Sequence, residues 1–264
     1  MAIPVSTLRA VDASRLCNPY TGEPLRLEAG ELVSVSSGQR FPIREGIPSF
    51  IPGSRLPPRS RIYRWLYDRF AFAYDFTLNL GPKVRYGTEA GVREEVIGRL
   101  PVGDGEAVLE TAAGTALNRR HLPKEADYYG LDISWKMLRG ARRNLDDWGL
   151  NARLFHADTQ YLPFHDNTFE HVIQMGGLQF IHDPFRAARE MGRVAKPGAT
   201  VTILDEAASA WRTLKRMPAH AAYAKDRASA IEELPRFVPQ GMQGVKAEVL
   251  PSGEFYLLSF RKPG

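Results

Sequence analysis

Short hydrophobic runs alternate with longer amphipathic segments from about residue 87 to the C-terminus. The short runs, rich in apolar and β-branched side chains, predict strands. They cover residues 107–111, 128–133, 152–156, 169–175, 200–205, 245–250 and 255–261. Segments with helical spacing cover residues 88–100, 134–148 and 184–194, and two more helices are expected within 207–237. Such alternation of strands and helices predicts a parallel sheet with helices on both faces.

The C-terminal end departs from this alternation. The last two predicted strands are joined by Pro251-Ser252-Gly253-Glu254, a tight hairpin loop, so one of them runs antiparallel. Ser134 is a favourable N-cap for the helix that follows it, and Lys196-Pro197-Gly198 stops the helix that ends near Val194. We therefore expect an α/β fold with a seven-stranded, mostly parallel, doubly wound sheet whose last hairpin is antiparallel.

The chain before this sheet divides into two further parts. Residues 1–53 are rich in Gly, Pro and short strand-like runs, which predicts a small β-rich ribbon. Residues 54–86 hold a linker and an aromatic helix candidate from Arg61 to about Leu78. Its aromatic side chains have helical spacing, so they either pack in a core or form a lid over a ligand. Residues 87–264 form the sheet domain.

The first strand of the sheet domain leads into a turn of small residues. Ala112-Ala113-Gly114-Thr115-Ala116 has no side chain large enough to keep a ligand from the backbone, and a helix with free N–H groups is expected after it. Asp132 lies 18 positions after Gly114, at the tip of the next strand. An acidic acceptor there is well placed for the two hydroxyls of a ribose. Together these features predict a nucleoside-containing ligand.

Composition narrows the class of protein. The chain has 264 residues, 44% hydrophobic and 25% charged, which is enough for one α/β core and a small appendage. No apolar run approaches the roughly 18 residues of a membrane span, and the N-terminus lacks a signal-peptide pattern, so a cytoplasmic protein without membrane contact is expected. The net charge of +5 permits an acidic partner, but the 35 bases and 30 acids are interspersed, without a basic tail for nucleic acid.

Five sequence motifs follow one another in a fixed order between residues 108 and 198. They are Val108-Leu109-Glu110-Thr111-Ala112-Ala113-Gly114-Thr115, Gly130-Leu131-Asp132-Ile133-Ser134 with Met137-Leu138, Ala157-Asp158 with Leu162-Pro163-Phe164, Asp166-Asn167-Thr168-Phe169-Glu170, and Glu190 with Arg193-Val194-Ala195-Lys196-Pro197-Gly198. In order and spacing they resemble class I S-adenosylmethionine-dependent methyltransferases of the small-molecule, UbiE-like type. The resemblance covers roughly residues 61–263 and implies a Rossmann-like fold with S-adenosyl-L-methionine as the cofactor.

The resemblance also implies roles for individual residues. Glu110 and Gly114 would frame the methionine moiety of the cofactor. Asp132 would bind the ribose hydroxyls, and Asp158 would bind the adenine amino group. Two positions at the end of the fourth strand would lie beside the sulfonium and its methyl group. These two are Met175 and Gly176, and the remaining implied cofactor-binding positions are Tyr74, Ala112, Ile133, Met137, Ala157 and Thr159.

Two residues after the fourth strand are candidates for the transfer step itself. His182 has a side chain suited to deprotonating a hydroxyl or an amine, although its position is also typical of a helix entry. Gln179, on the same loop, is a candidate for orienting a substrate. Methyl transfer from a sulfonium is an in-line displacement that mainly needs alignment and exclusion of water, so the sequence need not contain a strong catalytic dyad.

The glycine turn and the front segment depart from the patterns they resemble. Ala116 stands where the family usually has a third glycine, and a positive φ there would strain it. The front segment resembles the zinc ribbon of several bacterial methyltransferases, but Cys17, Tyr20, Ser34 and Ser37 stand at its four ligand positions. With one thiolate, and six histidines without ligand spacing, no metal is expected, so the ribbon has to be held by packing on the main domain.

The sequence therefore predicts an S-adenosylmethionine-dependent methyltransferase that acts on a small-molecule acceptor by O- or C-methylation, with secondary metabolism as one candidate setting. A ribosomal or transfer RNA base methyltransferase is the first alternative, favoured by the ribbon and the basic charge. Against it, Gln174-Met175-Gly176-Gly177 differs from the Asn-Pro-Pro-Tyr type of motif in many base N-methylating enzymes. The second alternative binds the cofactor without methylating. The oligomeric state is left open.

Overall fold

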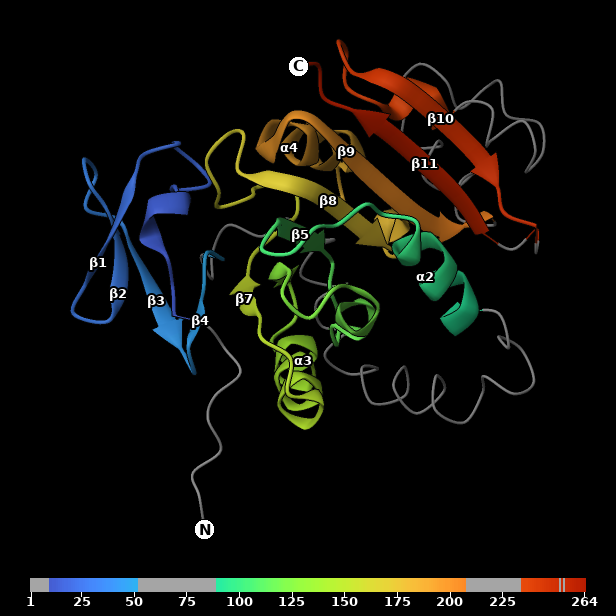
Figure 1. Cartoon of the computed structure of the whole chain (residues 1–264). Coiled ribbons are helices and arrows are strands. Elements are labelled where there is room, and N and C mark those ends of the chain that lie inside the picture. The colour runs from blue at the N-terminus through green and yellow to red at the C-terminus, as the bar shows by residue number, and fades with distance from the viewer. Residues whose placement is uncertain (1–9, 52–88, 208–233, 252, 254) are drawn as a thin grey trace.

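The protein consists of a small N-terminal sheet beside a larger sheet domain (Figure 1). The structure is a computed structural model that describes residues 10–51, 89–207, 234–251, 253 and 255–264. The aromatic helix expected at 61–78 lies outside the described residues, as does most of the 207–237 region with its two expected helices. No helix among the described residues combines the length and hydrophobicity that crossing a membrane requires.

The larger sheet has seven strands in the order β10-β11-β9-β8-β5-β6-β7. They are β5 (Ala107–Thr111), β6 (Asp127–Asp132), β7 (Arg153–His156), β8 (Phe169–Met175), β9 (Ala195–Glu206), β10 (Gln243–Val249) and β11 (Phe255–Arg261). Strands β5 to β9 are parallel, and β11 runs antiparallel to both of its neighbours, β9 and β10. The predicted seven-stranded, mostly parallel sheet with an antiparallel last hairpin is confirmed.

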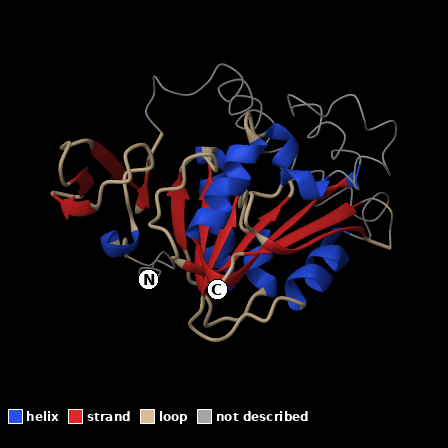
Figure 2. Ribbon diagram, turned by 90° about the horizontal axis from the view of Figure 1, so that it is seen from above, coloured by secondary structure: helices blue, strands red, loops and turns tan. Residues whose placement is uncertain are grey.

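Helices cover both faces of this sheet (Figure 2). The helices are α2 (Glu89–Gly98), α3 (Trp135–Trp148) and α4 (Pro184–Val194), with 3-10 helices η1 (Ala13–Arg15), η2 (Leu117–His121), η3 (Leu178–Phe180) and η4 (Leu234–Phe237). Successive strand residues point to opposite faces. Val108 and Ile173 share a buried cluster with residues of α2 and α3, whereas Leu109 and Val172 share one with residues of α4. The two apolar faces therefore form two cores, one on each side of the sheet.

The caps of α3 and α4 follow from the sequence. The Ser134 hydroxyl accepts a hydrogen bond from the Met137 N–H, and α3 ends at Gly149, whose φ of +63° is a conformation that glycine tolerates. Helix α4 ends at Val194 as expected, but β9 begins directly afterwards rather than at residue 200. The extra residues belong to the strand because Ala195 pairs with Phe169 across an irregularity in the β8–β9 register.

The prediction of a helix directly after the small-residue turn is wrong, because the chain forms only the short 3-10 helix η2 there. Ala116 precedes it with a left-handed φ of +59° and provides no side-chain cap. Pro123 follows closely, and the residue before a proline disfavours the helical conformation, so Leu122 is extended. The fully buried Arg119 donates to three backbone carbonyls around this loop. These bonds hold the loop in place of further helical turns.

The N-terminal module, defined here as residues 10–51, is a four-stranded antiparallel sheet with η1. Its strands are β1 (Leu25–Glu28), β2 (Glu31–Ser34), β3 (Arg40–Arg44) and β4 (Ile47–Pro48), in that order. The side-chain amide of Asn18 donates to the Ser34 hydroxyl at 2.9 Å, and the Ser37 hydroxyl donates to Glu23 at 2.7 Å. Ser34 and Ser37, which stand at two of the ligand positions of a zinc ribbon, thus form hydrogen bonds within the module. Within the described ranges, no three metal-ligating side chains come together.

Candidate cofactor site

The carboxyl ends of β5 and β8 mark the point where the strand order of the large sheet reverses. Loops leaving adjacent strands at such a point diverge and open a crevice, which is where α/β sheets bind ligands. The two strand ends are joined by a hydrogen bond of 3.1 Å from the Thr111 hydroxyl to the Gln174 side-chain carbonyl. Gly114 and Gly176, in the two diverging loops, each face open space within the described part of the chain, since an added Cβ would meet none of its atoms within 4 Å.

Asp132 connects the end of β6 to the glycine turn. One carboxylate oxygen accepts a hydrogen bond from the Gly114 N–H at 2.8 Å, and the other accepts one from the Ser134 N–H, also at 2.8 Å. The side chain is buried, with 8% of the residue exposed. One hydrogen bond therefore joins Asp132 to Gly114, the acid and the glycine that the sequence singled out.

Glu110 lies beneath the turn, inside the protein. Its carboxylate accepts hydrogen bonds from the Tyr128 hydroxyl at 2.6 Å and from the side-chain amide of Asn118, which in turn accepts one from Arg93 at 2.8 Å. Burial raises the pKa of Glu110 to about 7, although both hydrogen bonds act in the opposite direction. This carboxyl therefore links β5 to β6 and η2, and it changes charge near neutral pH.

Asp158 follows β7 and is held by its neighbour Gln160. One of its carboxylate oxygens accepts from the backbone N–H and the side-chain amide of Gln160, both at 2.9 Å, and the other accepts from the same amide at 3.0 Å. The Gln160 side-chain carbonyl accepts from the Asp183 N–H at 2.9 Å, which fixes the direction of the amide. Burial raises the pKa of Asp158, and the Gln160 hydrogen bonds oppose this shift.

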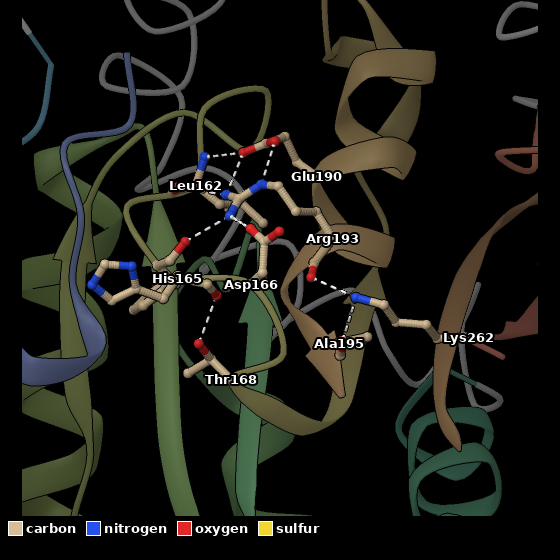
Figure 3. Close-up of polar contacts among 9 residues, drawn as sticks. Leu162, His165, Asp166, Thr168, Glu190, Arg193, Ala195 and Lys262 are labelled. Carbon is tan, nitrogen blue, oxygen red and sulfur yellow. Dashed lines mark hydrogen bonds and ion pairs between the residues drawn. The ribbon is translucent and has the colours of Figure 1, made fainter. Parts of the chain in front are cut away.

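The segment that follows Asp158 is fastened to α4 by Arg193 (Figure 3). The Arg193 guanidinium donates to Glu190 and to Asp166, each at 2.8 Å, and to the backbone carbonyls of Leu162 and Phe164. Lys262 donates to the backbone carbonyls of Arg193 and of Ala195, the first residue of β9, which ties the segment after β11 to the same point. The residues that follow Asp158 are therefore tied to α4 by several hydrogen bonds.

The loop after β8 carries the positions predicted for the acceptor side of the site. Gly176 and Gly177 have φ values of +88° and +87°, and the Leu178 N–H donates to the buried Asp205 carboxylate at 2.9 Å. His182 is exposed and directly precedes Asp183, the N-cap of α4, so its helix-entry position is as expected.

The other predicted site positions fall into three groups. Met137, Ala157, Thr159 and Met175 are buried at the ends of the strands or in the first turn of α3. Ala112 and Ile133 are half-buried, and Ala112 has a φ of +53°. Tyr74 lies outside the described residues, and the description of Gln179 covers its backbone, in η3, but not its side chain. The positions of these residues do not test their predicted roles in cofactor binding or catalysis, so each of these roles stays a prediction.

Comparison with known proteins agrees with this geometry. Residues 108–198 match the methyltransferase domain family. Demethylmenaquinone methyltransferase of Geobacillus kaustophilus is 30% identical over 55% of this chain and 62% of the relative, and the enzyme of that name from Corynebacterium efficiens is 34% identical over 53% and 57%. A crystal structure of Haemonchus contortus phosphoethanolamine N-methyltransferase 2 with S-adenosyl-L-methionine has a TM-score of 0.59 at 16% identity, covering 82% of this chain and 62% of that one.

The part of this chain that matches a methyltransferase domain, residues 108–198, runs from β5 to the start of β9 and includes Gly114, Asp132 and Asp158. We call the large sheet with its helices the methyltransferase domain, after this match. The chain spans about three fifths of the length of the curated relatives it matches.

Three residues that contact the methyltransferase site were not found from the sequence. The Gln160 side chain donates a hydrogen bond to Asp158, and the Asp205 carboxylate accepts one from the loop after β8. The His156 ring forms a hydrogen bond with Ser49 of the N-terminal module. Gln160 and His156 stand next to predicted positions, but their partners lie 23 and 107 residues away along the chain. No local pattern signals such contacts, because they depend on how distant segments pack.

Proposed function

We propose that this protein is an S-adenosylmethionine-dependent methyltransferase whose acceptor is a small molecule. The observation that carries the proposal is the arrangement of Glu110, Asp132 and Asp158 at the carboxyl ends of three adjacent parallel strands, around an open turn at Gly114. The cofactor presents an amine, two ribose hydroxyls and an adenine amine, all of them hydrogen-bond donors. The carboxylates of Asp132 and Asp158, placed along one edge of the sheet, fit the ribose hydroxyls and the adenine amine, while Glu110 lies behind them.

In the proposed reaction the protein mainly binds, orients and excludes water. Bound S-adenosylmethionine supplies a methyl group that its sulfonium has already activated. Asp132 would accept from the ribose hydroxyls, and Asp158 from the adenine amine through the carboxylate oxygen that Gln160 contacts once. The loop after β8 would place the acceptor in line with the methyl group. For an acceptor hydroxyl, the exposed His182 is the candidate base and Gln179 the candidate orienting residue.

The identity of the relatives supports a small-molecule acceptor. Both curated relatives are named demethylmenaquinone methyltransferases, so demethylmenaquinone is the first compound to test. Methylation of RNA bases is the competing outcome. A cytoplasmic site of action remains part of the proposal.

Calorimetry with S-adenosylhomocysteine tests the cofactor part of the proposal. We expect binding by the wild-type protein and a loss of about ten-fold in affinity in Asp132→Ala, because each lost hydrogen bond contributes roughly 0.5–1.5 kcal/mol. Asp147→Ala is the matched control, since Asp147 is exposed on the neighbouring helix α3. A wild-type protein that releases no heat with either the product or S-adenosylmethionine would remove the proposal.

Transfer of a labelled methyl group tests the acceptor. Extracted RNA, extracted metabolites and demethylmenaquinone are each incubated with the protein and labelled cofactor. We expect label in the small-molecule fractions. Label confined to unmodified RNA would assign the protein to the RNA alternative, and binding without any transfer would favour a protein that holds the cofactor without methylating.

A further inference from the structure

The N-terminal module adds to the exposed edge of the large sheet at β7, next to the proposed cofactor site. Ser49 forms a parallel bridge with His156, the last residue of β7, and the Phe50 N–H donates to the His156 carbonyl at 2.9 Å. The side chains of the same pair meet as well, because the Ser49 hydroxyl lies 2.8 Å from His156 Nδ1. Ser49 and His156 are both buried, so this contact is shielded from water.

His156 connects the module to two strand ends of the site. Its Nε2 lies 3.0 Å from the Ile133 carbonyl, which can only accept a hydrogen bond, so Nε2 carries the proton and Ser49 donates to Nδ1. Ile133 directly follows Asp132, and His156 is two residues before Asp158. One imidazole ring therefore lies between the module and the backbone of both proposed cofactor-binding acids.

The module also holds the far end of the segment that contains Asp158. Leu16 forms an antiparallel bridge with Phe164, the Cys17 N–H donates to the Pro163 carbonyl at 3.1 Å, and the His165 N–H donates to a carbonyl of η1. Between these anchors, the ring of Tyr20 packs on Tyr161 with 5.3 Å between centroids. The loop 157–165 is thus fixed by the N-terminal module at its start and at its end.

We propose that the N-terminal module is a positioning element of the cofactor site, with Ser49 and His156 as its positioning residues. The inference rests on the proposed function, because it assigns loop 157–165 to cofactor binding. A loop whose two ends are already fixed loses less conformational entropy when a ligand binds, and this raises affinity without a direct contact. The module therefore contributes to cofactor affinity through the loop although it lies outside the crevice.

The test compares three variants of the full chain by amide hydrogen exchange and by calorimetry with S-adenosylhomocysteine. Ser49→Ala removes the hydrogen bond to His156, and we expect faster exchange in 157–165 with a roughly five-fold weaker affinity. Ser49→Thr keeps the hydroxyl and should behave as the wild type. Glu45→Gln is the matched control, because it removes the ion pair in the exposed 2.8 Å contact from the module to Arg139 of α3 and does not touch the loop.

The outcomes separate this inference from the proposed function. Wild-type exchange and affinity in Ser49→Ala would overturn the positioning role. Faster exchange with unchanged affinity would show that the loop is held but does not serve the cofactor. Equal acceleration in Glu45→Gln would mean that any loosening of the module has this effect and would overturn the assignment to Ser49 and His156. A wild-type protein that fails to bind the product, while Ser49→Ala still exchanges faster, would overturn the proposed function and the cofactor role of the loop, and would keep only the hold of the module on the loop.

Discussion

At the scale of single residues, Glu110 makes the stability of the protein depend on pH. Its pKa is about 7 in the folded protein, above the ordinary value of 4.5, because the carboxyl is buried. As the pH rises, the unfolded chain therefore loses this proton first. The contribution of Glu110 to stability is full below about pH 4.5 and is lost as the pH rises to about 7.

Glu110→Gln should remove this part of the pH dependence, since an amide mimics the uncharged carboxyl. Between about pH 4.5 and pH 8, ionisation of Glu110 should lower the free energy of unfolding of the wild type by about 3 kcal/mol, because one pKa unit corresponds to about 1.4 kcal/mol. The variant should lack this loss. Urea denaturation at the two pH values measures the difference. Glu94→Gln, at an exposed position of α2, is the control, and parallel profiles for Glu110→Gln and wild type would contradict the prediction.

Ala112 lowers the stability of the protein, because it has a left-handed backbone conformation that favours glycine. Its φ is +53°, where alanine is less stable than glycine by about 1–2 kcal/mol, and its side chain is half-exposed. Ala112→Gly should therefore leave the free energy of unfolding equal or raise it by up to about 1 kcal/mol. Ala29→Gly, at φ +50° in the exposed β1–β2 turn, is matched in strain but distant from the site. We expect neither substitution to lower the free energy of unfolding. A lower value in both variants would show that φ alone does not determine the effect of these substitutions on stability.

Ala116 is different because its methyl group is completely buried. It shares a left-handed φ of +59°, but its side chain belongs to the apolar cluster on the α2 and α3 face. A glycine there would relieve strain and remove a buried methyl group at a cost of about 0.8 kcal/mol, so the two effects offset each other. This explains how an alanine is accommodated where the family usually has glycine.

At the scale of elements, the sequence predicted regular structure well and irregular structure poorly. The seven strands and the Ser134 cap depend on local patterns, and all appear in the structure. The helix after the turn failed because Ala116 and Pro123 confine it, and because buried Arg119 bonds to loop carbonyls, which no local pattern shows. At the site, the structure joins Gly114 and Asp132, which the sequence had singled out separately, whereas the contacts of His156 and Gln160 depend on tertiary packing.

The contact between α4 and the loop after β7 gives an element-scale prediction. Arg193 serves two carboxylates and two backbone carbonyls, so Arg193→Met leaves several partly buried acceptors without a donor. We expect a loss of about 3 kcal/mol in the free energy of unfolding. Arg189→Met, on the exposed face of the same helix, should change it by less than about 0.5 kcal/mol. Equal losses in the two variants would show that the network contributes little beyond helix packing.

At the scale of the whole molecule, the N-terminal module shares one hydrophobic core with the methyltransferase domain. Leu16, Leu32 and Phe41 of the module belong to the same buried cluster as Phe155 and Phe164 of the domain. A small isolated sheet buries too little apolar surface to be stable alone and usually needs a metal or disulfides. Packing against a large domain supplies the missing burial, so the module has a source of stability that does not involve metal.

The protein should therefore fold without zinc, and the state of Cys17 supports this expectation. Cys17 is the only cysteine in the sequence, and burial raises the pKa of its thiol to about 11, so without a metal it is a protonated thiol that packs like a small apolar side chain. We expect elemental analysis to find far less than one zinc per chain, and a chelator to leave the melting temperature unchanged. Cys17→Ala should lower the free energy of unfolding by no more than about 1.5 kcal/mol, the effect of a small cavity. Stoichiometric zinc that is lost in Cys17→Ala, together with a fall in melting temperature on chelation, would show instead that the module is a metal-dependent ribbon.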